Sequence, residues 1–522
     1  MKITENLGEF QKFIDSDSKT GLCLEDTIRF FDIQRIFGQF ESIKQSGIRV
    51  TLIMTNLMVM LFYRSRNIHS YFSRQFGKLG DREGSKNPYY DVLGNENISW
   101  RTILYLFAKR YLNLSGRIVE YSGKIRALIF DDSPIEKSGK KIEAVSKMHD
   151  HVIGRYIFGY KLLICGYWDG NNFIPVDFSL HRERGGELDK ARAKRNRARR
   201  KAKQAEAGYR EHRAQHLEKR AVLNSLKEEM NACSKKTIAV EFEKQEKRVS
   251  RSKKKQSKLR GRMKQAQTVL AEKEELVSKK EKKAPLYGLT PSQRRKQFRK
   301  KREKDSPGYE RRSEADMSKT QSVIKMLSRA VKRGFEFDYV LFDSWFFSKE
   351  ILARIESYRT KGIKLIAMVK MGKNLYRDYL SDRKMDATTL RKRYRNKETR
   401  NRKFNARYIK VPVWYDNRRV NLFFVKLGSG SKWKAFITND LEIGFNKLME
   451  IYHIRWSCEV FFKDAKQHLQ LGKCQCNNFD SQVGEILKVD CWELFEEIIR
   501  DNQKAEEIMR IFSPVLEKKL IA

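Results

Sequence analysis

Two acidic residues stand directly after short apolar segments, and a third lies within an apolar helical pattern. Asp131 follows residues 127–130, Asp343 follows residues 339–342, and Glu459 belongs to the third segment. The first two segments have the length and composition of buried strands, and ligands commonly bind beyond strand ends. Three carboxylates that converge from two strands and a helix would suit Mg²⁺, which prefers oxygen ligands and needs few protein carboxylates.

Such a site would support phosphodiester chemistry. Two divalent ions about 4 Å apart would activate an attacking water or hydroxyl and stabilise the leaving oxygen. Either aspartate alone could simply begin a turn or cap a helix, and Asp343-Ser344 fits such a cap. His149 and His151 form an HxH pair without a third zinc ligand, and the sequence contains no GxxxxGK[ST] phosphate loop. The three carboxylates together favour the metal-site interpretation.

The segment 451–469 carries polar residues of both signs on one side of an expected helix. At about 100° per residue, four of them fall within one narrow stripe: Tyr452, Arg455, Glu459 and Lys466. Apolar residues cover most of the remaining circumference, and a helix that is apolar nearly all round is buried. The stripe would therefore face a cleft or a partner. The alternative is a solvated face with ion pairs at i,i+3 and i,i+4 spacing.

The charge of the chain favours a polyanionic partner. Lys and Arg total 110 against 65 Asp and Glu, a formal net charge of +45. An excess of this size indicates nucleic acid before a membrane surface. Because 40% of the residues are hydrophobic and 11% are aromatic, the chain is not merely a disordered basic polymer.

About half of the charge excess lies in residues 191–300, which contain 36 Lys and Arg against 12 Asp and Glu. Between Tyr209 and Ala284 there is one glycine and no proline, which predicts two long helices. We expect an antiparallel hairpin that turns near residues 231–236, with dimerisation or non-specific DNA binding as its role. Lysines at expected core positions leave a single basic helix, partial disorder or a solvated spacer as alternatives.

Cysteine spacing and hydropathy indicate a soluble intracellular protein. The seven cysteines are scattered without a CxxC pair, as expected of reduced thiols. The most apolar run, residues 50–63, is 14 residues long, too short to span a bilayer. No signal peptide is expected at the start of the chain.

The remaining pattern alternates between helices and strands. Helical periodicity recurs in residues 24–40, 48–64 and 100–114. Three strand candidates within residues 126–180 predict an antiparallel meander, and residues 321–371 read as a βαβ-like unit. Three further strand candidates lie within residues 408–440.

The motifs resemble the insertion-sequence-4 group of bacterial DDE transposases. The shared features are a strand ending in Asp-x-Ser, a second strand ending in Asp before a helix, and the helix pattern Tyr-x2-Arg-x3-Glu-x6-Lys. The first two correspond to residues 130–141 and 340–346. The resemblance covers about residues 126–180 and 335–482, and the helix pattern is its most specific part.

The resemblance implies an α/β fold with an RNase H-like core, in which a mixed five-stranded sheet has flanking helices. It also implies a β-rich insertion, and we expect a helical N-terminal domain with possible DNA binding and a long basic helical, coiled-coil-like insertion. The expected divisions are 1–118 (N-terminal helices), 119–182 (first core part), 183–318 (basic insertion), 319–375 (second core part), 376–440 (β-rich insertion), 441–482 (catalytic helix) and 483–522 (helical tail).

The resemblance also implies a cut-and-paste transposase. Asp131, Asp343 and Glu459 would hold Mg²⁺ or Mn²⁺, two ions per site. Asp131 is preferred to its neighbour Asp132 because only Asp131 gives Asp-x-Ser.

The residues expected to contact the transposon end are Tyr452, Arg455 and Lys466. The expected partners are double-stranded DNA, both as terminal inverted repeats and as target, and a second copy in a homodimer. No membrane is involved, and the protein would act in the bacterial cytoplasm at the nucleoid. Two alternatives stay open: a metal-dependent nuclease without strand transfer, and a non-catalytic DNA-binding protein derived from a transposase. Whether a DNA hairpin forms during the reaction also stays open.

Overall fold

The computed structural model divides the chain into two compact units, residues 1–182 with 296–522 and residues 183–295. The residues that it describes are 31–62, 67–75, 86–115, 123–183, 186–232, 236–283, 289, 291–372, 374–428, 430 and 432–500. Among these residues, no helix combines the length and the apolar character needed to cross a membrane.

Helices precede the first strand in the first unit. The described ones are α3 (Ile33–Gly38), α4 (Val50–Phe62), α5 (Ile68–Gln75), α6 (Asn87–Leu93) and α7 (Trp100–Ser115). Helix α7 contacts strand β4 (Phe173–His181) and helix α17 (Phe479–Arg500). Its buried Phe107 lies 5.5 Å from Phe31 and 5.9 Å from Phe37, measured between ring centroids. The helix expected from residue 24 falls partly outside the described residues.

The sheet of this unit is mixed, as expected. Strands β1 (Ala127–Glu136), β3 (Arg155–Trp168) and β4 pair antiparallel in the order β1–β3–β4, which confirms the meander. Strand β2 (Ser146–Asp150) pairs with the first residues of β3. On the other side of β1, strands β5 (Tyr339–Phe342) and β6 (Lys364–Val369) follow in parallel. All residues of β4 are buried, as in a strand covered on both faces.

The expected five-stranded sheet is only part of the sheet in the described residues, which has 12 strands. The additional strands after β6 are β7 (Leu375–Asp378), β8 (Lys384–Asp386), β9 (Thr399–Asn401), β10 (Ala406–Tyr415), β11 (Arg418–Leu427) and β12 (Lys434–Thr438). Strand β12 pairs antiparallel with β6, so the β-rich segment continues the core sheet. Asp416 and Asn417 both have positive φ, 49° and 61°, as a two-residue turn between β10 and β11 requires.

Short helices connect and cover these strands. They are α11 (Pro307–Glu314), α12 (Lys319–Lys332), α13 (Lys349–Glu356), α14 (Ala387–Arg393), α15 (Phe445–His453) and α16 (Trp456–Gln467). Helices α11, α12 and α13 each begin after a serine whose hydroxyl accepts a backbone N–H of the first turn: Ser306, Ser318 and Ser348. Such caps satisfy N–H groups that the helix itself leaves unpaired. Helix α12 contacts β3 and β4, and α13 contacts β6.

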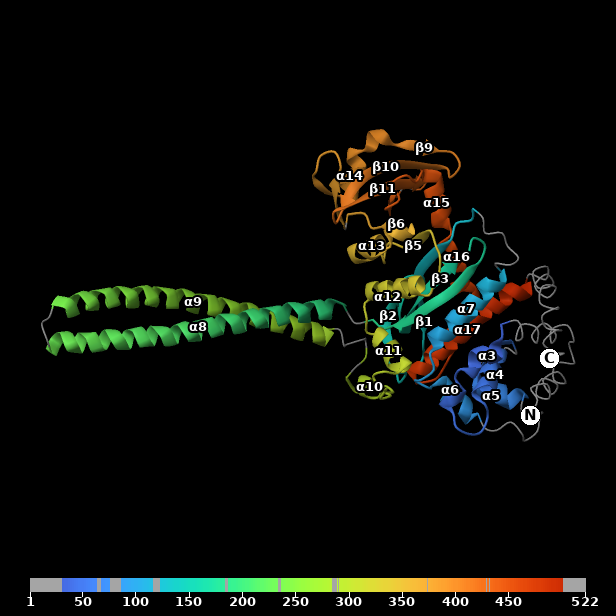
Figure 1. Cartoon of the computed structure of the whole chain (residues 1–522), viewed down its shortest axis with the longest axis horizontal. Helices are drawn as coiled ribbons and strands as arrows, with labels where there is room; N and C mark the ends of the chain where they lie inside the picture. Colours follow the sequence, from blue (N-terminus) through green and yellow to red (C-terminus); the bar gives the residue numbers. More distant parts are fainter. Residues whose placement is uncertain are drawn as a thin grey trace. The chain divides into compact units, whose positions relative to one another are not determined.

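The second unit consists mainly of two long helices, α8 (Gly186–Ala232) and α9 (Lys236–Lys283), followed by α10 (Pro291–Arg295). They form an antiparallel hairpin, drawn in green in Figure 1. Arg199 pairs with Glu274 at 2.9 Å, and the Gln245 amide donates to the Lys219 carbonyl at 3.1 Å. The buried side chains of the two helices are mostly small or polar: Ala191, Ala198, Ala202, His212, His216, Gln245, Ser252 and Val277. Leu223, Leu226, Leu259 and Leu270 are half-buried.

Candidate active site

Asp131 and Asp343 occupy matching positions on neighbouring strands. Strands β1 and β5 run parallel, and their last shared pair is Phe130 with Phe342. Both phenylalanines are fully buried, and their rings stack with centroids 5.1 Å apart. The two aspartates immediately follow these residues, so they lie side by side where β5 ends. The expected end of the first strand at Asp131 is wrong, because β1 continues to Glu136 through its pairing with β3.

The two adjacent aspartates of β1 have different partners. Asp131 accepts a hydrogen bond from Arg455 at 2.7 Å, whereas Asp132 forms a close ion pair with Lys319 at the start of α12. Successive side chains of a strand point to opposite faces, which explains the separation. Asp131, rather than Asp132, is therefore on the side of Arg455 and Glu459.

The expected single helix of residues 441–482 is divided in the structure. Helix α15 ends at His453 and α16 begins at Trp456. Between them, the N–H groups of Ile454 and Arg455 donate to carbonyls three residues earlier, both at 3.1 Å, in place of the four-residue spacing of an α-helix. Tyr452 thus belongs to α15 and Glu459 to α16, so the stripe is not carried by one continuous helix.

Arg455 links two of the three candidate ligands. One guanidinium nitrogen donates to Asp131 at 2.7 Å and the other contacts Glu459 closely. The Arg455 side chain is only 13% exposed and that of Glu459 is 37% exposed. Burial by itself would lower the pKa of Arg455, but Tyr452 and the two carboxylates outweigh it and raise that pKa. The guanidinium is therefore a fixed positive charge between the carboxylates.

Asp131 is a largely buried carboxylate with two other carboxylates nearby, an arrangement that disfavours its charged form. Burial raises the pKa of Asp131 to about 6, and the nearby charges of Asp132 and Asp343 raise it as well, although Arg455 opposes the shift. A buried carboxylate near others is stabilised by a cation. In this structure the cation is Arg455.

The two other residues of the helix signature contact different strands, Lys466 β1 and Tyr452 β12. Lys466 donates to the Ser133 hydroxyl at 2.7 Å, and Ser133 is two residues after Asp131 on the same face of the strand. Tyr452 is buried, and its ring meets the edge of Phe436 with centroids 4.8 Å apart. Burial raises the pKa of Tyr452 to about 12, so its hydroxyl is neutral at physiological pH.

The donor set has the oxygen chemistry that Mg²⁺ or Mn²⁺ prefers. Asp131 and Asp343 would be adjacent ligands, and Glu459 is linked to Asp131 through Arg455. Even so, no three His, Cys, Asp or Glu side chains of the described residues gather closely enough to hold a metal ion. Asp131 and Glu459 instead both contact the guanidinium of Arg455.

The histidine pair is not a metal site in the described structure. The rings of His149 and His151 contact one another with centroids 4.7 Å apart, and their other neighbours are the aromatic rings of Tyr156 and Trp345. Sequence reasoning did not identify Trp345 or Lys319 as neighbours of the candidate site. Trp345 could have been noticed because it follows Asp343 by two residues, whereas the partner of Asp132 depends on a contact 187 residues away.

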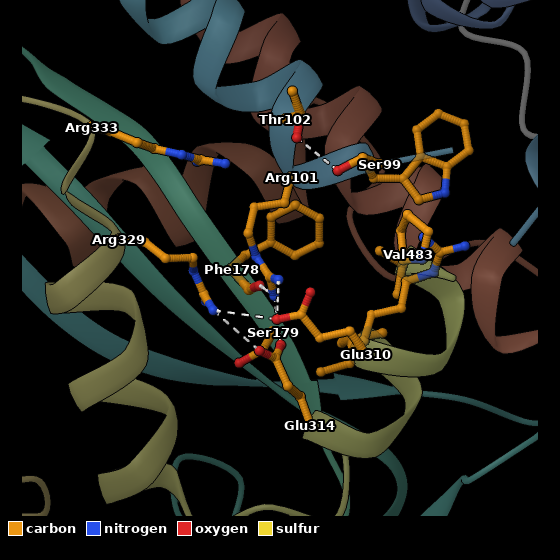
Figure 2. Close-up of a pocket in the computed structure, with 14 residues that line it drawn as sticks. Ser99, Arg101, Thr102, Phe178, Ser179, Glu310, Glu314, Arg329, Arg333 and Val483 are labelled. Atoms are coloured by element: carbon orange, nitrogen blue, oxygen red, sulfur yellow. Dashed lines mark hydrogen bonds and ion pairs between the residues drawn. The ribbon is translucent and has the colours of Figure 1, made fainter. Parts of the chain in front are cut away.

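A cavity of about 160 Å³ lies elsewhere, between α7, β4, α11 and α12. Figure 2 shows that arginines and carboxylates face each other across it. Arg101 and Arg329 each bind Asp177 at 2.7 Å, and both also contact Glu314. These charges neutralise one another, so the cavity is a structural ion-pair network and not a second candidate site.

Comparison with protein-family models gives two matches. Residues 309–490 match a model described as "Transposase DDE domain", and residues 78–227 match one described as "DDE superfamily endonuclease". Asp131 lies in the second range, and Asp343 and Glu459 lie in the first. No curated protein matches the chain. DDE endonuclease domains have an RNase H-like α/β core, and the mixed sheet with its helices agrees with such a core. Two stretches of the chain are therefore similar to DDE transposase and endonuclease domains, and this similarity supports a transposase-type function.

Proposed function

We propose that the protein is a metal-dependent DNA transposase that cleaves DNA at transposon ends and joins the freed strand to target DNA. The observation that carries the proposal is that Asp131 and Asp343 lie side by side where β5 ends, with Glu459 tied to Asp131 through Arg455. The insertion-sequence-4 resemblance and the two family matches support the same reaction class.

Asp131, Asp343 and Glu459 would hold Mg²⁺ or Mn²⁺, in a site for two ions. Bound metal would activate the nucleophile and stabilise the leaving oxygen of the phosphodiester. Glu459 lies in the first turn of α16, where the helix dipole stabilises a carboxylate in its charged, ligating form. The stacked rings of Phe130 and Phe342 hold β1 and β5 together just before the two aspartates, which therefore have little freedom to separate.

Arg455, Lys466 and Tyr452 would hold the transposon end. Arginine binds phosphate in a bidentate manner, and the bond between Arg455 and Asp131 can be exchanged for one to a DNA phosphate when a metal neutralises the carboxylate. Lys466 is bound to a neutral hydroxyl, not to a carboxylate, so its charge is available to the DNA backbone. Tyr452 would approach DNA only after local movement, because its ring is buried.

The broader assignments follow from the same proposal. The DNA partners would be the terminal inverted repeats and the target, and a homodimer would hold two ends together. The α8–α9 hairpin would bind DNA non-specifically or connect two copies. The resemblance places such an enzyme in the bacterial cytoplasm, at the nucleoid when bound to DNA.

The test compares Glu459→Ala with the control Glu450→Gln. Glu450 lies on α15 and pairs with the exposed Lys403 at 2.6 Å, so its loss should be harmless. With Mg²⁺ and a duplex that carries the flanking inverted repeat, Glu459→Ala should abolish cleavage and leave binding of the end largely intact. Equal loss of binding and cleavage would contradict the metal-ligand role. Products joined to a second DNA would separate transposition from simple nuclease action.

A further inference from the structure

The tip of the β2–β3 hairpin exposes apolar side chains. Its four residues, 151–154, connect Asp150 to its strand partner Arg155. Val152 is 91% exposed and Ile153 is 49% exposed. The Asp150 carboxylate accepts the N–H of Val152 at 2.8 Å, which holds the tip in a defined turn. Two adjacent apolar side chains at the end of a firm hairpin favour contact with another surface.

A continuous row of rings runs along the same hairpin. The ring of Tyr156 contacts His149, His149 contacts His151, and His151 lies over Trp345 with centroids 5.8 Å apart and an interplanar angle of 29°. Tyr156 and Trp345 are 65% and 66% exposed.

Lysines accompany both ends of this row. The Lys147 ammonium is 5.1 Å from the centroid of the Tyr156 ring, and that of Lys370 is 3.0 Å from the Trp345 ring. Exposed rings with adjacent cations are the combination that binds unpaired nucleotides, since rings stack on bases and cations attract the backbone.

Two observations place the row near Asp131 and Asp343. Trp345 follows Asp343 by two residues and touches His151 of the tip. On helix α16, Lys466 binds Ser133 of β1, and Asp150 at the base of the tip is near enough to raise the pKa of Lys466, although burial lowers it overall. The tip is therefore a neighbour of both the Asp343 loop and helix α16.

We propose that this hairpin tip separates the two strands of the DNA end. The Tyr156–His149–His151–Trp345 row then holds the nucleotides that have become unpaired. The inference rests on the proposed function and adds the DNA structure that the site takes. Val152 and Ile153 would enter between base pairs, as apolar side chains do when they unstack DNA. Lys370 would move from the indole to a phosphate as a base takes its place.

The test uses the full chain, Mg²⁺ and two forms of one duplex end: fully paired, or with three mismatched pairs next to the cleavage point. The variants are Val152→Ser with Ile153→Ser, Trp345→Ala and Trp345→Phe. The control is Leu380→Ser, a residue 70% exposed in the turn between β7 and β8. Loss of one stacked base should slow cleavage of the paired duplex roughly 5- to 150-fold. Thymine oxidation by permanganate reports unpaired bases.

We expect the tip double variant and Trp345→Ala to lose cleavage and permanganate reactivity on the paired duplex and to regain cleavage on the mismatched one. Trp345→Phe should retain most activity, and Leu380→Ser should be unaffected. Equal loss on both duplexes, or no loss on either, would overturn the inference. So would a change in oligomeric mass without a change in base reactivity, because the tip would then be a protein contact. Failure of the wild type to cleave either duplex would refute the proposed function instead.

Discussion

Arg455 provides the sharpest test of the site, because its guanidinium stands where a metal would neutralise Asp131 and Glu459. Replacing Arg455 by alanine removes a charged hydrogen bond to Asp131, and such bonds contribute about 1.5–3 kcal/mol. The bond to Glu459 adds only about 0.3–0.5 kcal/mol, since Glu459 is 37% exposed and the pair is an i,i+4 surface pair. Without metal, Arg455→Ala should therefore lower the free energy of unfolding by about 2–3.5 kcal/mol.

Mg²⁺ should increase the free energy of unfolding more in Arg455→Ala than in the wild type. A ligand at 100 times its dissociation constant stabilises a folded protein by about 2.7 kcal/mol. In the variant the carboxylates are free to bind Mg²⁺, whereas in the wild type the metal must first displace the guanidinium. The stabilisation by Mg²⁺ should therefore be larger in Arg455→Ala, by on the order of 2 kcal/mol.

The measurement is urea unfolding of the wild type and Arg455→Ala, with Mg²⁺ or with KCl of equal ionic strength. The double variant Arg455→Ala/Asp343→Asn should lose the additional response because one ligand is gone. If Mg²⁺ stabilises the wild type and Arg455→Ala equally, Arg455 does not occupy the place of a metal. If Arg455→Ala is as stable as the wild type without metal, the carboxylates do not need a neighbouring cation, and the reasoning fails.

Three further predictions concern the frame and the helical unit. Asp480 is fully buried and accepts hydrogen bonds from Arg302 at 2.9 Å and Arg311 at 2.6 Å. Asp480→Ala should lower the free energy of unfolding in urea by about 3–5 kcal/mol, because two buried cations lose their partner. For Asp177, burial would raise the pKa, but Arg101 and Arg329 outweigh it and lower that pKa below its usual value. Its contribution is complete above an unfolded pKa of about 3.9 and is lost as pH falls below that value. Asp177→Asn should therefore be less stable at pH 7, and its stability should change less than that of the wild type as pH falls below about 4. In α9, changing Lys253, Lys254 and Lys255 together to glutamine should reduce the slope of log affinity for DNA against log salt by up to about 3, and an unchanged slope would exclude DNA contact there.

The strands of the site could be predicted because their signal is local. Residues 127–130 and 339–342 are short apolar runs that are each followed by an aspartate. The first run begins β1 and the second forms β5, and all eight residues are buried. Helices α8 and α9 could be predicted for the same reason. A long segment without proline and nearly without glycine contains no local signal that would end a helix.

Features that depend on distant residues could not be predicted in the same way. The antiparallel pairing of β6 with β12 extends the core sheet, but it is set by tertiary packing and not by either strand's own pattern. The contact of Asp480 with Arg302 and Arg311 joins residues about 170 positions apart. Between α8 and α9, the most buried positions also include alanine, serine, glutamine and histidine, which an apolar heptad pattern does not single out.

The break between α15 and α16 shows that residues spaced for one face of a helix can lie on two successive helices. The spacing of Tyr452, Arg455 and Glu459 fits one side of a continuous helix, and nothing in the local sequence, such as proline, marks an interruption. The interruption lies at Arg455, whose backbone turns with three-residue hydrogen bonds. It makes Arg455 the residue before α16, and Glu459 then falls in the first turn. There the helix dipole favours the charged carboxylate, while Arg455 reaches Asp131 across the strand edge. The bend therefore brings Glu459, a candidate metal ligand, and Arg455, a competing cation, to the same place beside Asp131. For this reason, Mg²⁺ should stabilise the folded protein more strongly once Arg455 is removed.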